Sequence, residues 1–285
     1  MSILTAIFQA IGQALTWVLP VSESGHSAIF HDFSGRYTNA CSQLTGIIHI
    51  GIAIGIFIAF YRLFFGLSKN FFAGFNDLFH KRLDVKGASP QRRFMYMTIL
   101  SLAFFVFYLI PSGAHGNLFM LFHRTSFNGN LIGEGICMAL TGVLIIASCA
   151  VVNKTTGKIP YILQAVILGI TAFLALPFAG CSFMGGILFV GIIVGMSEKS
   201  ALRYSAAMSV PVLITAGIIE LCIGVTKLSA VSAIIALIIS VLISFFAVKI
   251  LIYVIKNKSI KYFAVYDAVI GIICFVIGVF ESVVK

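Results

Sequence analysis

The sequence has little charge of either sign. Only 10% of its 285 residues are charged, whereas 60% are hydrophobic and the mean hydropathy is +1.09. A soluble domain needs about a quarter of its residues charged to cover its surface. The shortage of charge therefore argues against a water-soluble globular protein.

Cysteine is also sparse, and its spacing carries no pattern. No two cysteines have the CxxC spacing of a metal or redox motif, and most lie in apolar stretches, where a thiol acts as a small hydrophobic group. They are Cys41, Cys137, Cys149, Cys181, Cys222 and Cys274. We therefore predict neither a metal cluster nor a disulfide framework.

Long apolar runs fill the chain instead. They cover residues 46–60, 94–110, 131–152, 159–178, 185–196, 206–225, 228–255 and 262–280. About 20 apolar residues cross a bilayer as a helix. The first run, 3–19, lacks the basic start and cleavage site of a secretory signal, so we expect a structural helix there. The chain is predicted to be an all-α, polytopic integral membrane protein with a single membrane domain over 1–285.

Basic residues exceed acidic ones, 19 to 9, which gives a net charge of +10. They concentrate in three short segments, 67–93, 154–158 and 256–261. Cytoplasmic loops of membrane proteins carry such an excess. The segments are therefore expected in the cytoplasm, with 67–93 as a cytoplasmic loop, and no nucleic-acid partner is predicted. The polar segment that starts at Ser22 then begins on the extracytoplasmic side.

A polar break interrupts the apolar sequence near the start of the chain. Residues 20–26 read Pro-Val-Ser-Glu-Ser-Gly-His. Ionisable groups at membrane depth are costly and usually line a site or a cavity. The break is therefore the first candidate for a functional site.

A similar break occurs in the second half. Residues 14–25 and 172–185 each contain an apolar stretch that ends in Leu-Pro, followed by small residues with Ser and Gly. Broken helices at matching places in two halves are typical of inverted-repeat transporters with a site at the repeat interface. We predict two inverted repeats, about 1–152 and 159–285, each with a re-entrant broken helix. Chance similarity between apolar sequences is the alternative.

Motifs follow one another in a characteristic order. They are Leu15-Thr16, Leu19-Pro20-Val21-Ser22, Ser24-Gly25-His26, Arg62–Leu67, Leu174–Pro177 with Ser182 and Gly185, Gly195-Met196-Ser197, Ser205 with Val210-Pro211, Lys249, and Phe263–Tyr266. Over essentially the whole chain this pattern resembles the undecaprenyl pyrophosphate phosphatase (bacitracin-resistance) family. The resemblance implies a hydrolase of the bacterial plasma membrane that removes the terminal phosphate of a polyprenyl lipid carrier for cell-wall synthesis. It also implies re-entrant helices and an outward-facing site.

Several positions depart from the family pattern. The two glutamates that would hold a divalent cation are Gln13 and Trp17, and the arginine of the second signature is Phe183. The middle serine of the first signature is Glu23. Glutamine is a poor ligand for a hard cation and tryptophan is none. A role for Mg²⁺ or Ca²⁺ is expected only if the family chemistry survives, and no metal ligand is assigned.

A replacement site remains open as a hypothesis. Glu23 and His26 share a helical face, and His49 lies inside the next apolar run. These could form an acid–base or metal site, with Ser22 or Ser24 as the nucleophile. The alternative is that Glu23 sits at a helix N-terminus and His49 bonds to a neighbouring helix. We expect Gly25, Ser182, Gly185 and His49 to contact the substrate.

Other polar residues in or beside apolar runs have structural explanations that involve no functional site. Glu220 and Asp267 could touch an ion or a headgroup, although a structural salt bridge or a water-lined position is the simpler account. Lys249 is expected to reach the interface, and His123 and Arg124 are expected in a solvated outer loop.

Two classes of function stay open. One is action on a polyprenyl phosphate or diphosphate lipid, with hydrolysis in question because the acids and the arginine are replaced. The other is a flippase or small-solute transporter on the same scaffold, whose site needs only to bind and release. The sequence leaves the identity of the lipid and any homo-oligomer undecided.

Overall fold

The computed structural model describes residues 3–34, 43–80, 87–113, 116–126, 130–152, 155, 157, 160–224 and 228–284. Helices account for most of these residues. They are α1 (Ile3–Val18), α2 (Glu23–Ser34), α3 (Gln43–Ala59), α4 (Tyr61–Phe79), α5 (Pro90–Ala103), the 3₁₀-helix η1 (Phe104–Leu109), α6 (Leu118–Ser126), α7 (Ile132–Val151), α8 (Ile162–Ala175), α9 (Phe183–Ile193), α10 (Glu198–Ile223), α11 (Ala230–Lys256) and α12 (Lys261–Val284). The prediction of an all-α chain is confirmed.

Five helical segments of the described residues are long and apolar enough to cross a membrane. They are Pro90–Leu109, Ile132–Val151, Glu198–Ile223, Ala230–Lys256 and Lys261–Val283. The pair α3 and α4 also passes this test, but it bends by 93° between Ala59 and Tyr61. The polytopic membrane protein expected from hydropathy is therefore confirmed.

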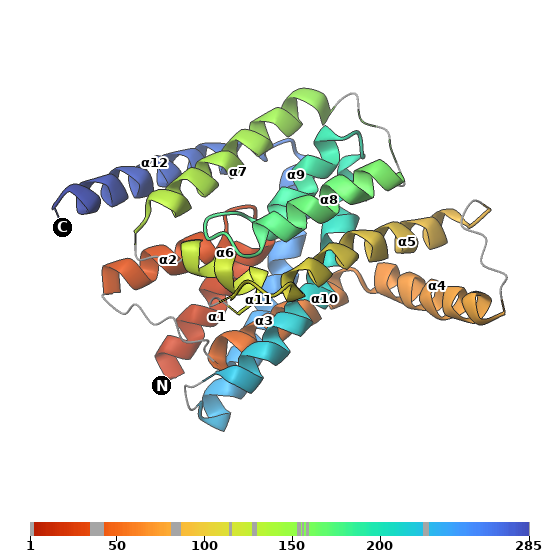
Figure 1. Ribbon diagram of the computed structural model, residues 1–285, viewed down its shortest axis with the longest axis horizontal. Coiled ribbons are helices and arrows are strands. Elements are labelled where there is room, and N and C mark those ends of the chain that lie inside the picture. The colour runs from red at the N-terminus through yellow and green to blue at the C-terminus, as the bar shows by residue number, and fades with distance from the viewer. Residues whose placement is uncertain are drawn as a thin grey trace.

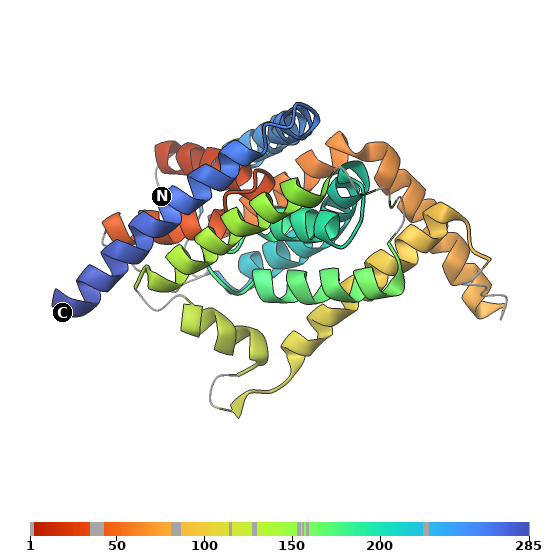
Figure 2. The same ribbon diagram turned by 90° about the horizontal axis from the view of Figure 1, so that it is seen from above.

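The segment 67–93, expected to be a loop, is mainly helical where it is described. Helix α4 continues to Phe79, and α5 begins at Pro90, where Ser89 accepts a hydrogen bond from the Arg92 amide. Phe71, Phe75 and Phe79 recur every four residues, as on one face of a helix, a spacing that the clustered charge obscured. Figures 1 and 2 show α4 and α5 projecting from the same end of the molecule.

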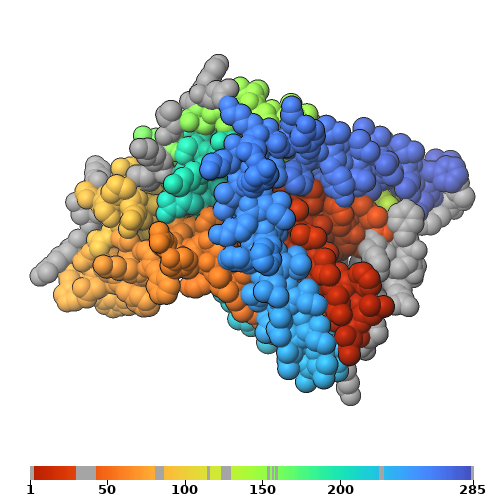
Figure 3. Space-filling model, turned by 180° about the vertical axis from the view of Figure 1, so that it is seen from behind, coloured from red at the N-terminus to blue at the C-terminus, as the bar shows by residue number. Residues whose placement is uncertain are grey.

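Helix packing follows a paired pattern. Helix α3 crosses α10, and α7 lies against α12. Helix α1 of the first half packs on α11 of the second, and α5 of the first half packs on α8 of the second. Figure 3 shows α11 running along one face with α1 beside it. The pairing brings the first and second halves of the chain together along several helices.

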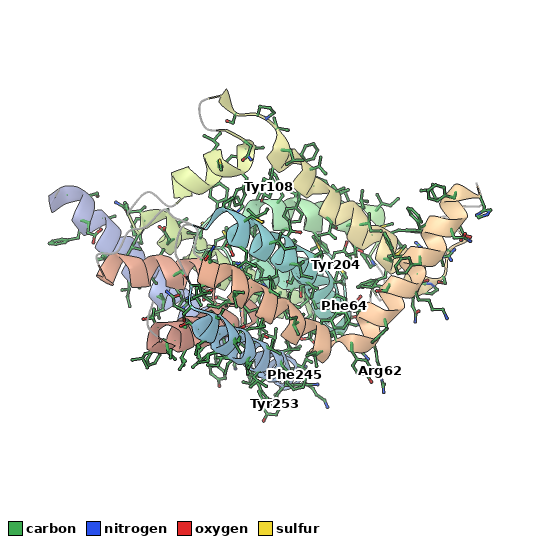
Figure 4. All side chains as sticks on the ribbon, turned by 90° about the horizontal axis from the view of Figure 1, so that it is seen from below. Arg62, Phe64, Tyr108, Tyr204, Phe245 and Tyr253 are labelled. Atoms are coloured by element: carbon green, nitrogen blue, oxygen red, sulfur yellow. The ribbon has the colours of Figure 1, made fainter. Side chains whose placement is uncertain are left out.

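One buried tyrosine joins three helices in the interior. The hydroxyl of Tyr204 on α10 donates to the Met97 carbonyl at 2.6 Å and lies 2.7 Å from Oγ of Ser101 on α5. Ser101 in turn donates to the Ala165 carbonyl of α8 at 2.6 Å. Figure 4 shows Tyr204 between helices, whereas Arg62 and Tyr253 point outward. The network satisfies polar groups that would be costly in an apolar interior.

Helices α7 and α12 approach closely because glycines face each other across their contact. A Cβ on Gly135 would lie 2.6 Å from the Gly271 carbonyl oxygen, whereas a Cβ on Gly133 would meet nothing within 4 Å. We expect Gly135→Ala to lower the free energy of unfolding by about 1–3 kcal/mol through overpacking. Gly133→Ala on the same helix should leave the free energy of unfolding unchanged or raise it slightly. Thermal unfolding of both variants in the same nanodiscs tests this, and equal effects would contradict it.

Candidate functional site

The first polar break is a tight turn between two short helices. Helix α1 ends at Val18, just before Pro20, and α2 begins at Glu23. Ser22 adopts a φ of 54°, and its Oγ accepts a hydrogen bond from the Gly25 amide at 3.1 Å. A serine that accepts from the third following amide is a typical helix N-cap. Ser22 therefore starts α2.

The second break is built in the same way. Helix α8 ends at Ala175, and Gly180 turns the chain with a φ of 91°. Oγ of Ser182 accepts from the Gly185 amide at 3.2 Å and caps α9. The Ser–x–x–Gly cap thus occurs in both breaks, within the two segments, 14–25 and 172–185, that resemble each other in sequence.

The two breaks lie against each other. The Ser22 hydroxyl donates to the Cys181 carbonyl at 3.3 Å, and the Gly180 amide donates to Oγ of Ser24 at 3.3 Å. A Cβ on Gly25 would come within 3.0 Å of the Gly180 Cα. We call this contact, formed by residues 20–25 and 177–185, the junction. It brings together Ser22, Ser24, Gly25, Ser182 and Gly185, as the predicted site requires.

His26 leaves the junction toward α12. Its Nδ1 lies 2.7 Å from the Ser22 carbonyl oxygen, and its Nε2 lies 2.6 Å from the Tyr266 hydroxyl. A carbonyl only accepts, so Nδ1 carries a proton and, in the neutral ring, Nε2 accepts from the tyrosine. The imidazole is thus held in one orientation at the edge of the junction.

Glu23 and His49 lie on the other side. Oε1 of Glu23 accepts from the Ser27 hydroxyl at 3.1 Å, while Nδ1 of His49 is 2.8 Å from Oε2 of Glu220 on α10. No hydrogen bond joins Glu23, His26 and His49, although all three are described. The structure therefore gives no support to a single site made of these residues. His49 instead bonds to a neighbouring helix, the alternative foreseen from the sequence, and Glu23 occupies the first turn of α2.

Aromatic rings occupy the place expected for the charged groups. The Trp17 ring lies 5.5 Å from the Phe183 ring and 5.6 Å from the His49 ring. A cavity of about 40 Å³ remains beside them, lined by Thr16, Trp17, Glu23, Ser24, Ala175, Leu176, Cys181 and Phe183. Among the described residues, no three His, Cys, Asp or Glu side chains are placed to hold a metal ion. The site does not fit a divalent cation.

Neither serine of the first break has a base bonded to it. The hydroxyl of Ser22 is used by the Cys181 carbonyl, and His26 bonds to the backbone carbonyl of Ser22 rather than to its side chain. A nucleophile needs a neighbouring base within about 2.6–3.2 Å. Ser22 and Ser24 remain candidate nucleophiles by position only.

Tyr266 and Thr141 were not singled out as site residues from the sequence. The Tyr266 hydroxyl meets His26, and Oγ1 of Thr141 lies 3.5 Å from the Ser182 amide. Tyr266 belongs to the motif Phe263–Tyr266, but nothing in the sequence indicates that it contacts His26, 240 residues earlier. Only the packing of α12 brings the two together.

The remaining polar candidates lie away from the junction or outside the described residues. Asp267 is 1% exposed, and neither of its carboxylate oxygens has a hydrogen-bond partner. Nζ of Lys249 lies 5.2 Å from the Phe245 ring centre. The side chains of His123 and Arg124 and the residue Cys41 lie outside the described residues. No disulfide joins the cysteines that are described.

Comparison with known proteins gives consistent matches over nearly the whole chain. Residues 6–273 match the family model described as bacitracin resistance protein BacA. The chain is 30% identical to an undecaprenyl-diphosphatase of Methanosphaera stadtmanae, covering 98% of this chain and 99% of that protein. It is 29% identical to an undecaprenyl-diphosphatase of Halothermothrix orenii, covering 98% of this chain and 100% of that protein. A third, from Alkaliphilus metalliredigens, is 28% identical over 95% of this chain and 97% of its own length.

Proposed function

The chain belongs to the bacitracin resistance protein BacA family, and from this membership we propose that it acts on a polyprenyl phosphate or diphosphate lipid carrier whose phosphate head binds at the junction. The relatives are named undecaprenyl-diphosphatases, which makes a polyprenyl diphosphate the natural ligand class. The apolar tail of such a lipid would lie in the bilayer beside the helices. The head would reach the polar break from the membrane.

The convergence of two helix N-termini carries this proposal. Helices α2 and α9 both start at the junction with serine caps. Free amides and the positive end of the helix dipole favour an anion at such a place. His26, at the rim, can donate from Nε2 to a phosphate when protonated, in place of its bond to the Tyr266 hydroxyl. These features support binding of a phosphate without a metal.

Hydrolysis by the family route is not supported by the residues present. Trp17 and Phe183 pack ring against ring where an acid and an arginine were expected. Electrostatic stabilisation is usually the largest catalytic term, and the loss of one donor alone costs about 10²–10³ in rate. We therefore propose that the junction binds the lipid but does not release phosphate by that mechanism.

The second candidate is a lipid flippase or small-solute transporter that works without hydrolysis. The Trp17–Phe183 contact favours it, because an aromatic lining allows a ligand to bind and leave without strong charge pairing. Two inverted repeats, about 1–152 and 159–285, belong to the same proposal. The matching serine caps and the paired helix packing support them.

The proposed location is the plasma membrane, with the junction on the extracytoplasmic side. The basic segments near 67–93, 154–158 and 256–261 support this orientation through the excess of Lys and Arg in cytoplasmic loops.

Binding and hydrolysis can be measured separately on the purified protein in nanodiscs. We expect the wild type to bind undecaprenyl phosphate and to release no phosphate from undecaprenyl diphosphate, with or without Mg²⁺. His26→Ala should weaken binding about tenfold, because a hydrogen bond to a charged group contributes about 1.5–3 kcal/mol. Tyr266→Phe removes the 2.6 Å hydrogen bond that orients the His26 imidazole. It should weaken lipid binding by a smaller factor.

Tyr262→Phe is the matched control, because Tyr262 lies on the same helix and is 67% exposed. It should leave binding unchanged. Phosphate release that needs both Mg²⁺ and His26 would refute the proposal that the protein binds the lipid without hydrolysing it. Absence of binding by folded protein would refute the lipid site itself.

A further inference from the structure

A buried ion pair lies at the crossing of the two halves of the chain. Helices α3 and α10 touch through glycines: a Cβ on Gly46 would lie 2.8 Å from the Gly217 carbonyl oxygen, and a Cβ on Gly217 would lie 2.7 Å from that of Gly46. Three residues after each glycine, about one helical turn, come His49 and Glu220. Their side chains meet at 2.8 Å. Equivalent places on the two helices thus carry a base and an acid that bond to each other.

The pair lies in an apolar setting that makes charge expensive. His49 is 7% exposed and lies within a helix whose other residues are almost all apolar. An ionised group at membrane depth is stable only when it is paired, and such groups usually serve an ion pathway or a site. Glu220 supplies the partner across 171 residues of sequence. A simple packing contact would need neither group.

The surroundings of His49 contain one further ionisable group. Glu23 on α2 interacts electrostatically with both His49 and Glu220. Helix α1 contributes the Trp17 ring and no ionisable group. Helix α11 faces α3 with serines, because Ser240 and Ser244 lie against glycines 51 and 55. Two carboxylates therefore act on one imidazole, and no cation other than the imidazole itself interacts with it among the described groups.

One nitrogen of the ring is left without a partner. An ionised carboxylate only accepts, so Nδ1 of His49 donates to Glu220, and Nε2 is the atom that can gain or lose a proton. Nε2 is buried and has no hydrogen-bond partner in the described part of the chain, and the same holds for Nε1 of Trp17 beside it. The indole nitrogen is a donor only and cannot hold the proton. Nε2 therefore belongs to a ring that bonds to Glu220 through its other nitrogen, interacts electrostatically with Glu23 and lies beside the Trp17 ring.

We propose that His49 binds an exchangeable proton at Nε2 inside the membrane, and that this proton strengthens the hold of α3 on α10. The neutral ring gives Glu220 a hydrogen bond, whereas the imidazolium gives it a full ion pair in a low-dielectric interior. Proton uptake thus tightens the contact between the two halves. The inference goes beyond lipid binding and needs no lipid, and in a transporter it would make the proton the coupled ion.

The chain contains its own reporter of this event. Trp17 is the only tryptophan in the sequence, and its ring lies 5.6 Å from that of His49. An imidazolium quenches a neighbouring indole more strongly than neutral imidazole does. Tryptophan emission of the protein in nanodiscs without a polyprenyl lipid, followed between about pH 4 and 9, should fall as pH falls, with one midpoint.

Substitutions identify the residue whose protonation changes the tryptophan emission. His49→Gln should abolish the step. Glu220→Gln should move it to lower pH by at least about one unit, because the ion pair no longer favours the charged ring. Glu23→Gln should move it the same way by less, and His80→Gln, a change at the exposed residue that follows α4, should leave it in place.

Circular dichroism at each pH reports whether each variant is folded. The proposal is overturned if wild-type emission is flat across this range, or if the same step persists in folded His49→Gln. A midpoint that ignores Glu220→Gln would overturn the role of the pair. Because no polyprenyl lipid is present, failure of polyprenyl lipid binding leaves this result unaffected.

Discussion

Phosphate release from undecaprenyl diphosphate is expected to appear in the triple variant Gln13→Glu, Trp17→Glu, Phe183→Arg. The three changes restore two acids four residues apart on α1 and an arginine at the start of α9, where the rings of Trp17 and Phe183 now touch. A preorganised cationic donor at developing charge contributes about 10²–10³ in rate. We expect release in Mg²⁺ to exceed that of the wild type by at least about this factor.

The control keeps the acids and omits the arginine. The variant Gln13→Glu, Trp17→Glu, Phe183→Gln should lose most of the gain. Thermal unfolding of each variant establishes that the buried charges are tolerated. Equal release by the wild type and the triple variant would show that the aromatic pair does not block the chemistry.

Gly180→Ala is expected to be the most destabilising single methyl addition at the junction. Gly180 has a φ of 91°, and an added Cβ would collide with the Glu134 backbone and lie 2.8 Å from the Cys137 Cβ. Left-handed backbone costs an L-residue about 1–2 kcal/mol, and overpacking about 1–3 kcal/mol more. The free energy of unfolding should fall by about 2–5 kcal/mol.

Gly113→Ala separates the two causes. Gly113 also has a positive φ, 55°, but a Cβ there meets nothing within 4 Å. Only the backbone cost should remain, about 1–2 kcal/mol. Thermal unfolding in identical nanodiscs gives both values. If Gly180→Ala costs no more than Gly113→Ala, the close contact between Gly180 and helix α7 is not as described.

Local signals located the two breaks well. Proline stops a helix and small residues allow a tight turn wherever they occur, so 20–25 and 177–185 could be recognised without knowing what they touch. The same signals indicated that Ser22, Ser24, Gly25, Ser182 and Gly185 belong to one site. Clustered charge in 67–93 gave no sign that α4 and α5 occupy most of its described part, and the cytoplasmic location of this segment stays a prediction.

Side-chain contacts between residues far apart in the chain could not be predicted from such local signals. His26 and Glu23 are neighbours in sequence, yet one bonds to Tyr266 on α12 while the other bonds to Ser27 and lies near His49. Helical spacing predicted a shared face, but it does not say which distant helix covers that face. The proposed grouping of Glu23, His26 and His49 depended on that missing information.

The sequence by itself determined that the chain is a helical membrane protein with two broken segments, because hydropathy and backbone breakers act locally. It also revealed that the family's charged positions are replaced, since that depends only on residue identity. Only the tertiary structure decided that Trp17 meets Phe183, that Tyr266 meets His26, and that His49 meets Glu220. These contacts arise from helix crossings between residues far apart in the chain, and crossings depend on the shapes of both partners at once.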